Sequence, residues 1–262
     1  MPLPGEGANP TLRKALHIVL DPGHGGGDEG TVYRGASMNI AEKEITLSLA
    51  YAVGKQLRNQ GYQVTLTRES DRELALPART ALANRLKADL FISIHMNSSQ
   101  ISAQGIETYI LNHTTDAASK RLAHLENSII FNSASGSEKD PDVALILKDL
   151  QLDANFAESK QLACLIQENL ISPQPIEGEK TRDYRKINRG VKQALFHVLL
   201  GADMPSVLVE AGFLSHPEDR SRVLSPQGQL QIGRSITAAV QQFFRQKKDQ
   251  KVMHSLGKCK II

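Results

Sequence analysis

Residues 16–26 read LHIVLDPGHGG, and this stretch decides the fold class. Leu16 to Asp21 is a short apolar run that ends at Pro22 and Gly23, a pattern typical of a buried strand entering a glycine-rich loop. A helix is predicted next over residues 42–60, because apolar residues recur every four positions and a glycine caps the end: Ile45, Leu49, Val53, Leu57 and Gly61. Strand, glycine loop and helix in this order indicate an α/β unit.

Further strands and helices are expected to alternate along the chain. The expected strands cover residues 62–68, 90–95, 105–111 and 206–210, and the expected helices cover residues 77–87, 156–170 and a last segment that begins at Ser225-Pro226. Alternation predicts an α/β fold with a mainly parallel twisted sheet and helices on both faces. We expect one domain over residues 16–245, preceded by a leader (residues 1–15) and followed by a basic tail (residues 246–262).

Length and composition agree with a globular protein. The chain has 262 residues, of which 40% are hydrophobic and 23% are charged, so it can bury a sizeable core. No apolar run approaches the ~18 to 20 residues of a membrane-spanning helix, so no transmembrane segment is predicted. Residues 1–10 lack the apolar centre of a signal peptide.

The charge lies mainly in the tail. The formal net charge is +3, with +4 in residues 246–262 and −1 in the rest, so the expected folded part is close to neutral. This distribution does not predict a nucleic-acid partner, and we interpret the tail as a solvated extension. Cys164 and Cys259 are 95 positions apart, which predicts neither a disulfide framework nor a thiolate metal site.

Three of the apolar strands end at a residue that can bind a metal or transfer a proton. These residues are His24, His95 and Glu210, and parallel sheets bind ligands at the carboxyl ends of their strands. A hydrolytic zinc site needs about three nitrogen or oxygen ligands and one open position. Glu42, with Glu44 as its competitor, offers the missing carboxylate. Taken singly, each histidine also fits a turn or rim role, and a glutamate in a first helical turn also complements the helix dipole.

Four motifs in order resemble the zinc-dependent N-acetylmuramoyl-L-alanine amidases of the amidase-3 family. They are Asp21-Pro-Gly-His-Gly-Gly, Glu42-Lys43, SIHMN at residues 93–97 and VEAGFLS at residues 209–215. The resemblance covers residues 17–111 and 155–244. It implies that one Zn²⁺ is bound by His24, Glu42 and His95, and that Glu210 is the catalytic carboxylate. The implied reaction is hydrolysis of the amide between N-acetylmuramic acid and the L-alanine of the peptidoglycan stem peptide, with Asn97 as a candidate substrate contact.

The resemblance also suggests regulation and a location. Cell-division members of this family carry an insertion whose helix blocks the zinc until a partner protein displaces it, and residues 122–127 (LAHLEN) resemble the sequence just before that insertion. Residues 125–152 are therefore a candidate regulatory insertion that an activator would displace, with a simple surface excursion as the alternative. The substrate implies a periplasmic or wall-associated protein. Two other functions stay open: a catalytically silent wall-binding module, and a zinc peptidase that cleaves another amide.

Overall fold

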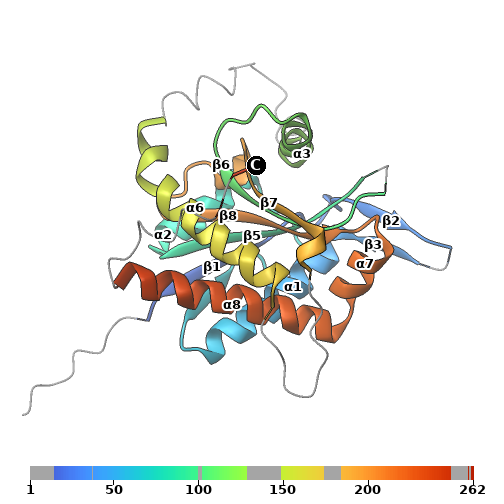
Figure 1. Cartoon of the computed structure of the whole chain (residues 1–262), viewed down its shortest axis with the longest axis horizontal. Helices are drawn as coiled ribbons and strands as arrows, with labels where there is room; N and C mark the ends of the chain where they lie inside the picture. The colour runs from blue at the N-terminus through green and yellow to red at the C-terminus, as the bar shows by residue number, and fades with distance from the viewer. Residues whose placement is uncertain are drawn as a thin grey trace, which may run out of the picture.

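The computed structural model describes residues 15–36, 38–99, 102–128, 149–173, 184–248, 259 and 261–262, without the side chains of residues 149–154. A six-stranded sheet runs through the centre of the molecule in the order β4-β1-β5-β8-β6-β7 (Figure 1). Its strands are β1 (His17–Pro22), β4 (Gln63–Leu66), β5 (Leu90–Asn97), β6 (Ile106–Leu111), β7 (Asn188–Ala194) and β8 (Ser206–Phe213).

The sheet is parallel except at one junction, where β6 pairs antiparallel with β8. The other neighbouring pairs, β1–β4, β1–β5, β5–β8 and β6–β7, are parallel. All residues of β1, β5 and β8 are buried, because helices cover both faces of a parallel sheet and leave no side of its central strands in water. The mainly parallel α/β fold predicted from the sequence is confirmed.

Helices form a layer on each face of the sheet (Figure 1). On one face lie α1 (Glu42–Asn59), α6 (Asp149–Ile171) and α8 (Pro226–Lys248), with α8 packed against both other helices. On the other face lie α2 (Leu76–Arg85), α3 (Ala117–Asn127) and the 3₁₀-helix η2 (His197–Leu199). The remaining elements are the hairpin of β2 (Val32–Arg34) and β3 (Asn39–Ala41), the 3₁₀-helix η1 (Arg185–Ile187) and α7 (Pro217–Leu224).

The predicted elements are present, and the structure adds others. The helix expected over residues 156–170 begins earlier, at Asp149, and the sequence prediction missed α3, α7, β7 and the β2–β3 hairpin. β7 reads NRGVKQA, which lacks the alternating or continuous apolar pattern of a strand. Most of the candidate insertion, residues 129–148, lies outside the described residues, as does nearly all of the expected leader.

The end of the chain corrects two of our expectations. Cys164 of α6 and Cys259 form a disulfide with their Cα atoms 5.9 Å apart, so the prediction of no disulfide is wrong. The view of the tail as a solvated extension is also wrong for its last residues. Ile261 bridges Val191 of β7 in parallel, and the backbone N–H of Ile262 donates to the Val191 carbonyl at 2.9 Å. Residues far apart along the chain can lie close together in space when their segments pack on the same core.

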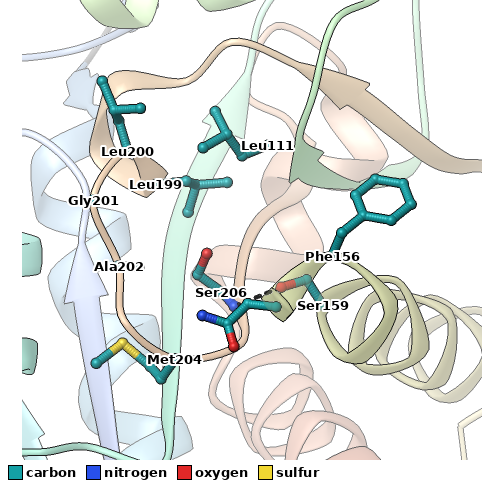
Figure 2. Close-up of a pocket in the computed structure, with 10 residues that line it drawn as sticks. Leu111, Phe156, Ser159, Leu199, Leu200, Gly201, Ala202, Met204 and Ser206 are labelled. Carbon is teal, nitrogen blue, oxygen red and sulfur yellow. Dashed lines mark hydrogen bonds between the residues drawn. The ribbon is translucent and has the colours of Figure 1, made fainter. Parts of the chain in front are cut away.

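Within the described residues, no helix has both the length and the apolar character needed to cross a membrane. A small cavity of about 40 Å³ lies where β8 begins and β6 ends (Figure 2). Leu111, Phe156, Leu199 and Met204 line it, and its polar contact is a hydrogen bond of 3.0 Å from the Ser206 backbone to the Ser159 hydroxyl. This cavity is too small for a sugar-peptide substrate and has no titratable side chain in its wall, so the functional site lies elsewhere.

Candidate metal centre and catalytic carboxylate

The candidate site lies at the carboxyl ends of the central strands, as the sequence predicts. His95 of β5 pairs in register with Glu210 of β8, so these two side chains stand next to each other on one face of the sheet. His24 follows β1 in the glycine-rich loop, and Glu42 begins α1. The chain crossovers therefore bring four distant residues to one edge of the sheet.

Two glycines allow the backbone to approach the site closely. A Cβ atom on Gly23 would lie 2.4 Å from Cε1 of His95, and one on Gly30 would lie 2.6 Å from Cδ2 of His24. Any larger residue would displace an imidazole, so the glycines of the loop are needed for space. His24 itself has a φ of 62°, a left-handed conformation that non-glycine residues seldom adopt outside functional sites.

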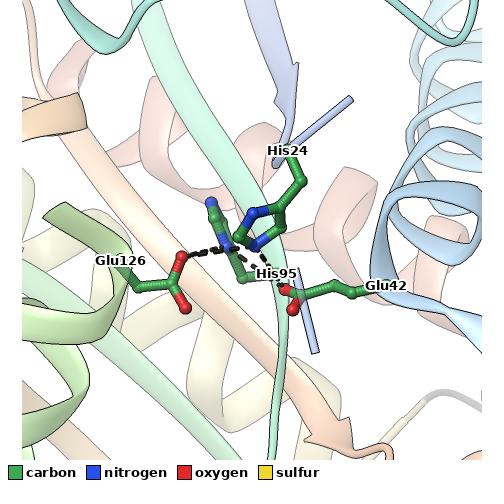
Figure 3. A group of neighbouring side chains, drawn as sticks. All are labelled: His24, Glu42, His95 and Glu126. Carbon is green, nitrogen blue, oxygen red and sulfur yellow. Dashed lines mark ion pairs between the residues drawn. The ribbon is translucent and has the colours of Figure 1, made fainter. Parts of the chain in front are cut away.

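The ligand atoms of His24, Glu42, His95 and Glu126 all lie within 4.8 Å of one another. Oε1 of Glu42 is 3.1 Å from Nε2 of His24 and 3.3 Å from Nδ1 of His95. Figure 3 shows the two imidazoles between Glu42, from α1, and Glu126, from α3. The structure thus brings together the three expected ligands, while the competitor Glu44 is exposed on α1.

The donor set suits a divalent metal ion. Nε2 of His24 and Nδ1 of His95 are buried and have no hydrogen-bond partner among the described residues, which is costly unless a ligand uses their lone pairs. Nδ1 of His24 is held at 2.7 Å by Asp28, an outer carboxylate that turns Nε2 toward the centre. Two imidazoles and one carboxylate are a set that zinc enzymes use.

The carboxylate of Glu42 is fixed on both oxygens. Oε1 accepts a hydrogen bond of 2.8 Å from the Met96 backbone, and Oε2 accepts one of 2.9 Å from the Thr31 backbone. The buried Arg79 supports the neighbouring loop, because it donates to the carbonyl oxygens of Pro22 and His24 at 2.8 and 3.0 Å. The ligands are therefore preorganised by the fold.

The ionisation of the ligands reflects the packing of carboxylates around imidazoles. Burial opposes a charge on His95, but the carboxylates of Glu126 and Glu42 raise its pKa to about 10. Burial likewise opposes a charge on His24, and Glu42 and Glu126 raise its pKa well above the ordinary value. A positive charge at the centre of these carboxylates is therefore favoured, and a metal ion supplies such a charge.

The sequence analysis missed Glu126. Its Oε2 lies 3.3 Å from Nε2 of His24 and 3.0 Å from Nδ1 of His95. The carboxylate of Asp116 caps the start of α3 at the Ser119 backbone N–H. Asn127 holds the other end, because its amide donates to the Leu195 carbonyl at 2.7 Å and accepts from the His197 backbone at 2.8 Å. The only signal in the sequence was the LAHLEN motif at residues 122–127. A motif alone does not reveal that Glu126 contacts His24 and His95.

Glu210 is completely buried, and neither of its carboxyl oxygens has a hydrogen-bond partner among the described residues. Burial raises its pKa well above the ordinary value; His95 opposes this shift, and the carboxylates of Glu126 and Glu42 add to it. A buried carboxyl group with a raised pKa, next to a candidate metal site, suits general acid–base chemistry.

Asn97 ends β5 close to the ligands and is buried. Its side-chain oxygen accepts a hydrogen bond of 2.7 Å from the Ser98 backbone, and its carbonyl accepts one of 2.8 Å from the Leu214 backbone. Both contacts shape the loop after β5, so a substrate contact at Asn97 stays a prediction.

Comparison with known proteins agrees with this geometry. Residues 18–242 match the Amidase_3 family model, described as N-acetylmuramoyl-L-alanine amidase. The chain is 34% identical to the N-acetylmuramoyl-L-alanine amidase AmiC of Neisseria meningitidis over 92% of its own length, and 31% identical to AmiA of Escherichia coli K12 over 89%. It spans 55% of the length of the first relative and 78% of the second.

A solved structure has the same fold. The N-acetylmuramoyl-L-alanine amidase of Clostridium difficile 630 superposes with a TM-score of 0.64 at 28% identity, covering 89% of this chain and 98% of that one. The family match extends over most of the chain and includes every residue of the site described above. The chain therefore belongs to the Amidase_3 family of N-acetylmuramoyl-L-alanine amidases.

Proposed function

We propose that this chain hydrolyses the amide between N-acetylmuramic acid and the L-alanine of the peptidoglycan stem peptide. The observation that carries the proposal is the buried, unpartnered carboxyl group of Glu210 beside a cluster with the donor set of a hydrolytic zinc site. Family membership supplies the substrate class.

In this proposal His24, Glu42 and His95 bind one Zn²⁺. Bound zinc would polarise the scissile carbonyl and lower the pKa of a water molecule toward neutrality. The carboxylate of Glu210 accepts a proton from the attacking water and delivers it to the leaving nitrogen as the C–N bond breaks. Its raised pKa serves both steps, because the group must bind a proton firmly in the first and release it in the second.

Glu126 gives the proposed site a resting state. A hydrolytic zinc site keeps one position open for water or substrate, and the carboxylate of Glu126 lies 3.3 Å from Nε2 of His24 and 3.0 Å from Nδ1 of His95. We propose that α3 closes the site, that residues 125–152 form the regulatory segment, and that an activator protein moves this segment away. The proposed location is the periplasm or cell wall, where peptidoglycan lies, and the proposed role is wall remodelling during cell division.

Product analysis tests the reaction. Purified peptidoglycan is incubated with the zinc-loaded protein, and the soluble products are identified by mass spectrometry. We expect free stem peptides that begin with L-alanine, and a loss of roughly 10²- to 10⁴-fold in their release by Glu210→Gln with an unchanged zinc content. Release of other fragments would point to a peptidase acting on another amide.

A matched pair of variants tests the metal ligand. Glu42→Gln is expected to lose zinc and activity together, whereas Glu44→Gln, two positions away and exposed, is expected to keep both. Equal zinc contents in the two variants would contradict the role of Glu42.

A further inference from the structure

A second charged cluster lies beside Glu210, on β6 and β7. Glu107 of β6 is opposite Glu210 in the antiparallel pairing with β8, so both carboxyl groups stand on the same face of the sheet. Glu107 is 2% exposed. One of its oxygens accepts from the Tyr109 hydroxyl, and the other forms ion pairs with Nε of Arg189 and, at 3.3 Å, with Nζ of Lys192.

An irregularity in β7 brings both cations to this one carboxylate. Ile106 pairs with Asn188 and Thr108 pairs with Val191, so two residues of β7, Arg189 and Gly190, face the single residue Glu107. Without this bulge, Arg189 and Lys192 would lie on opposite faces of the sheet, because side chains alternate along a strand. Bulges of this kind redirect side chains and occur often next to active sites.

Two cations share the one carboxylate of Glu107. Lys192 is 9% exposed, and among the described residues Glu107 is its only charge partner within ion-pair range. Arg189 is open to water, with 37% of its side chain exposed, and its guanidinium lies 5.1 Å from the centre of the Phe213 ring. Among the described residues, neither terminal amino group of Arg189 donates a hydrogen bond, so both can donate to an anion.

The helix that carries Glu126 also covers this cluster. α3 packs on β7. The hydrogen bonds of Asp116 with Ser119 lower the pKa of Asp116, and Lys192 lowers it further, which puts Lys192 near the start of α3. Movement of α3 would therefore open the metal centre and expose Lys192 beside Arg189, which is already open to water.

The distance from the metal ligands to the cations fits the spacing of the substrate. His95, Glu210 and Glu107 lie on three successive strands, and neighbouring strands are about 4.8 Å apart, so Glu107 lies roughly 10 Å from His95. Two residues of extended peptide span about 7 Å. The second residue of a stem peptide is a glutamate linked through its side chain, and its free α-carboxylate would reach this region when the L-alanine amide lies at the metal centre.

We propose that Lys192 and Arg189 bind the free carboxylate at the second position of the stem peptide, in a subsite that opens when α3 moves. This inference rests on the proposed amidase function. In this proposal the enzyme distinguishes stem peptides by the charge at their second position. This position carries a carboxylate in an isoglutamate peptide and a neutral carboxamide in the isoglutamine form.

Equilibrium binding tests the subsite without turnover. The zinc-loaded Glu126→Ala/Glu210→Gln protein is titrated by calorimetry with two ligands, N-acetylmuramoyl-L-alanyl-D-isoglutamate and its isoglutamine form. We expect the acid to bind roughly 10- to 100-fold more tightly, the range of a hydrogen bond to a charged group. In the same background, Lys192→Met and Arg189→Gln are expected to reduce this preference and leave the affinity for the amide unchanged.

Two further variants separate binding from folding. Lys192→Arg keeps the charge and is expected to keep most of the preference, and Lys186→Met, which removes an exposed cation from η1, is expected to leave it intact. Each protein is checked by its melting temperature and zinc content. Equal affinity of the parent for acid and amide, no binding of either ligand, or equal weakening of both by Lys192→Met would overturn the inference.

A parallel assay separates a failure of the subsite proposal from a failure of the amidase proposal. The Glu126→Ala protein with Glu210 intact is assayed in parallel for release of free stem peptide from purified peptidoglycan. Release without any preference for the acid overturns the subsite alone, whereas the absence of release overturns the proposed function.

Discussion

Oε2 of Glu126 lies 3.0 Å from Nδ1 of His95, which places a carboxylate of α3 within the group of candidate metal ligands. The contact joins helix α3 to the central sheet. Under the proposed function, this pair of atoms links the regulatory segment to the catalytic centre.

Removal of this contact should activate the enzyme. For Glu126→Ala we expect turnover of purified peptidoglycan to rise roughly tenfold or more, because the closed arrangement loses the interaction that favours it over the open one. Dye release from labelled peptidoglycan measures the rate. Leu125→Ala, which truncates the exposed neighbouring side chain on the same helix, is the control and should leave the rate unchanged. An unchanged rate in Glu126→Ala with full zinc occupancy would count against the closed state.

Metal binding should release protons. In the metal-free protein the pKa of His95 is raised to about 10 and that of His24 is raised well above its ordinary value, so both imidazoles are protonated at pH 7. A metal ion must displace these protons, so roughly two should be released per ion and the apparent affinity should increase as the pH rises from 7 to 10. Calorimetry in buffers of different ionisation enthalpy counts the released protons. A count below one proton per metal ion would contradict the raised pKa values of the two histidines.

The same shifts affect the stability of the metal-free protein. A raised pKa in the folded state stabilises the protein fully below the ordinary histidine value of about 6.5, and this contribution is lost as the pH rises through about 10. Treatment with a chelator should therefore lower the melting temperature more at pH 9 than at pH 6. A chelator effect independent of pH would show that the carboxylates do not stabilise protonated imidazoles.

The buried ion pair below the site should be essential for stability. Asp21 lies 2.9 Å from Nη1 of Arg79, and both residues are buried. Asp21→Ala leaves Arg79 without its counter-charge and should lower the free energy of unfolding by about 3–5 kcal/mol in urea titrations. Asp71→Ala breaks the pair between the exposed Asp71 and Lys43 and should cost much less, because water screens this pair. Similar losses in the two variants would show that burial of the pair is unimportant.

Acid should weaken the buried pair. Although burial raises the pKa of Asp21, the charge of Arg79 and the hydroxyls of Thr67 and Ser93 outweigh it, and the pKa is lowered. A lowered pKa stabilises the protein above the ordinary value of about 3.9, and this contribution is lost as the pH falls through the folded-state pKa. Stability of Asp21→Asn should consequently depend less on pH below 4 than that of the unaltered protein.

The disulfide should stabilise the fold. Cys164 and Cys259 are 95 residues apart, and closing a loop of about 100 residues contributes at most about 4.7 kcal/mol in the chain-entropy estimate. Reductant should lower the melting temperature by several degrees, and the Cys164→Ser/Cys259→Ser variant should start from that lower value and not respond to reductant. Two free thiols in the purified protein, detected by alkylation and mass spectrometry, would contradict the disulfide.

The sequence by itself determined the class of fold and the edge of the sheet where the candidate site lies. Apolar runs that lead to His24, His95 and Glu210 are local patterns, and a parallel sheet brings the ends of such runs together for general reasons. Glu42 could be proposed over Glu44 through the family motif, and the structure then showed it buried among the ligands. These inferences needed only periodicity, residue chemistry and order along the chain.

Only the tertiary structure decided where Glu126, Lys192 and Arg189 lie relative to the candidate site, and whether Cys164 meets Cys259. Glu126 is 31 positions from His95 and shows a surface pattern, while β7 is too polar to be identified as a strand because its charges pair with the buried Glu107. Contacts between residues so far apart leave no local periodicity, since they depend on how helices and strands pack in space. The sequence therefore indicated where the candidate site lies, and the packing of α3 and β7 determined what surrounds it.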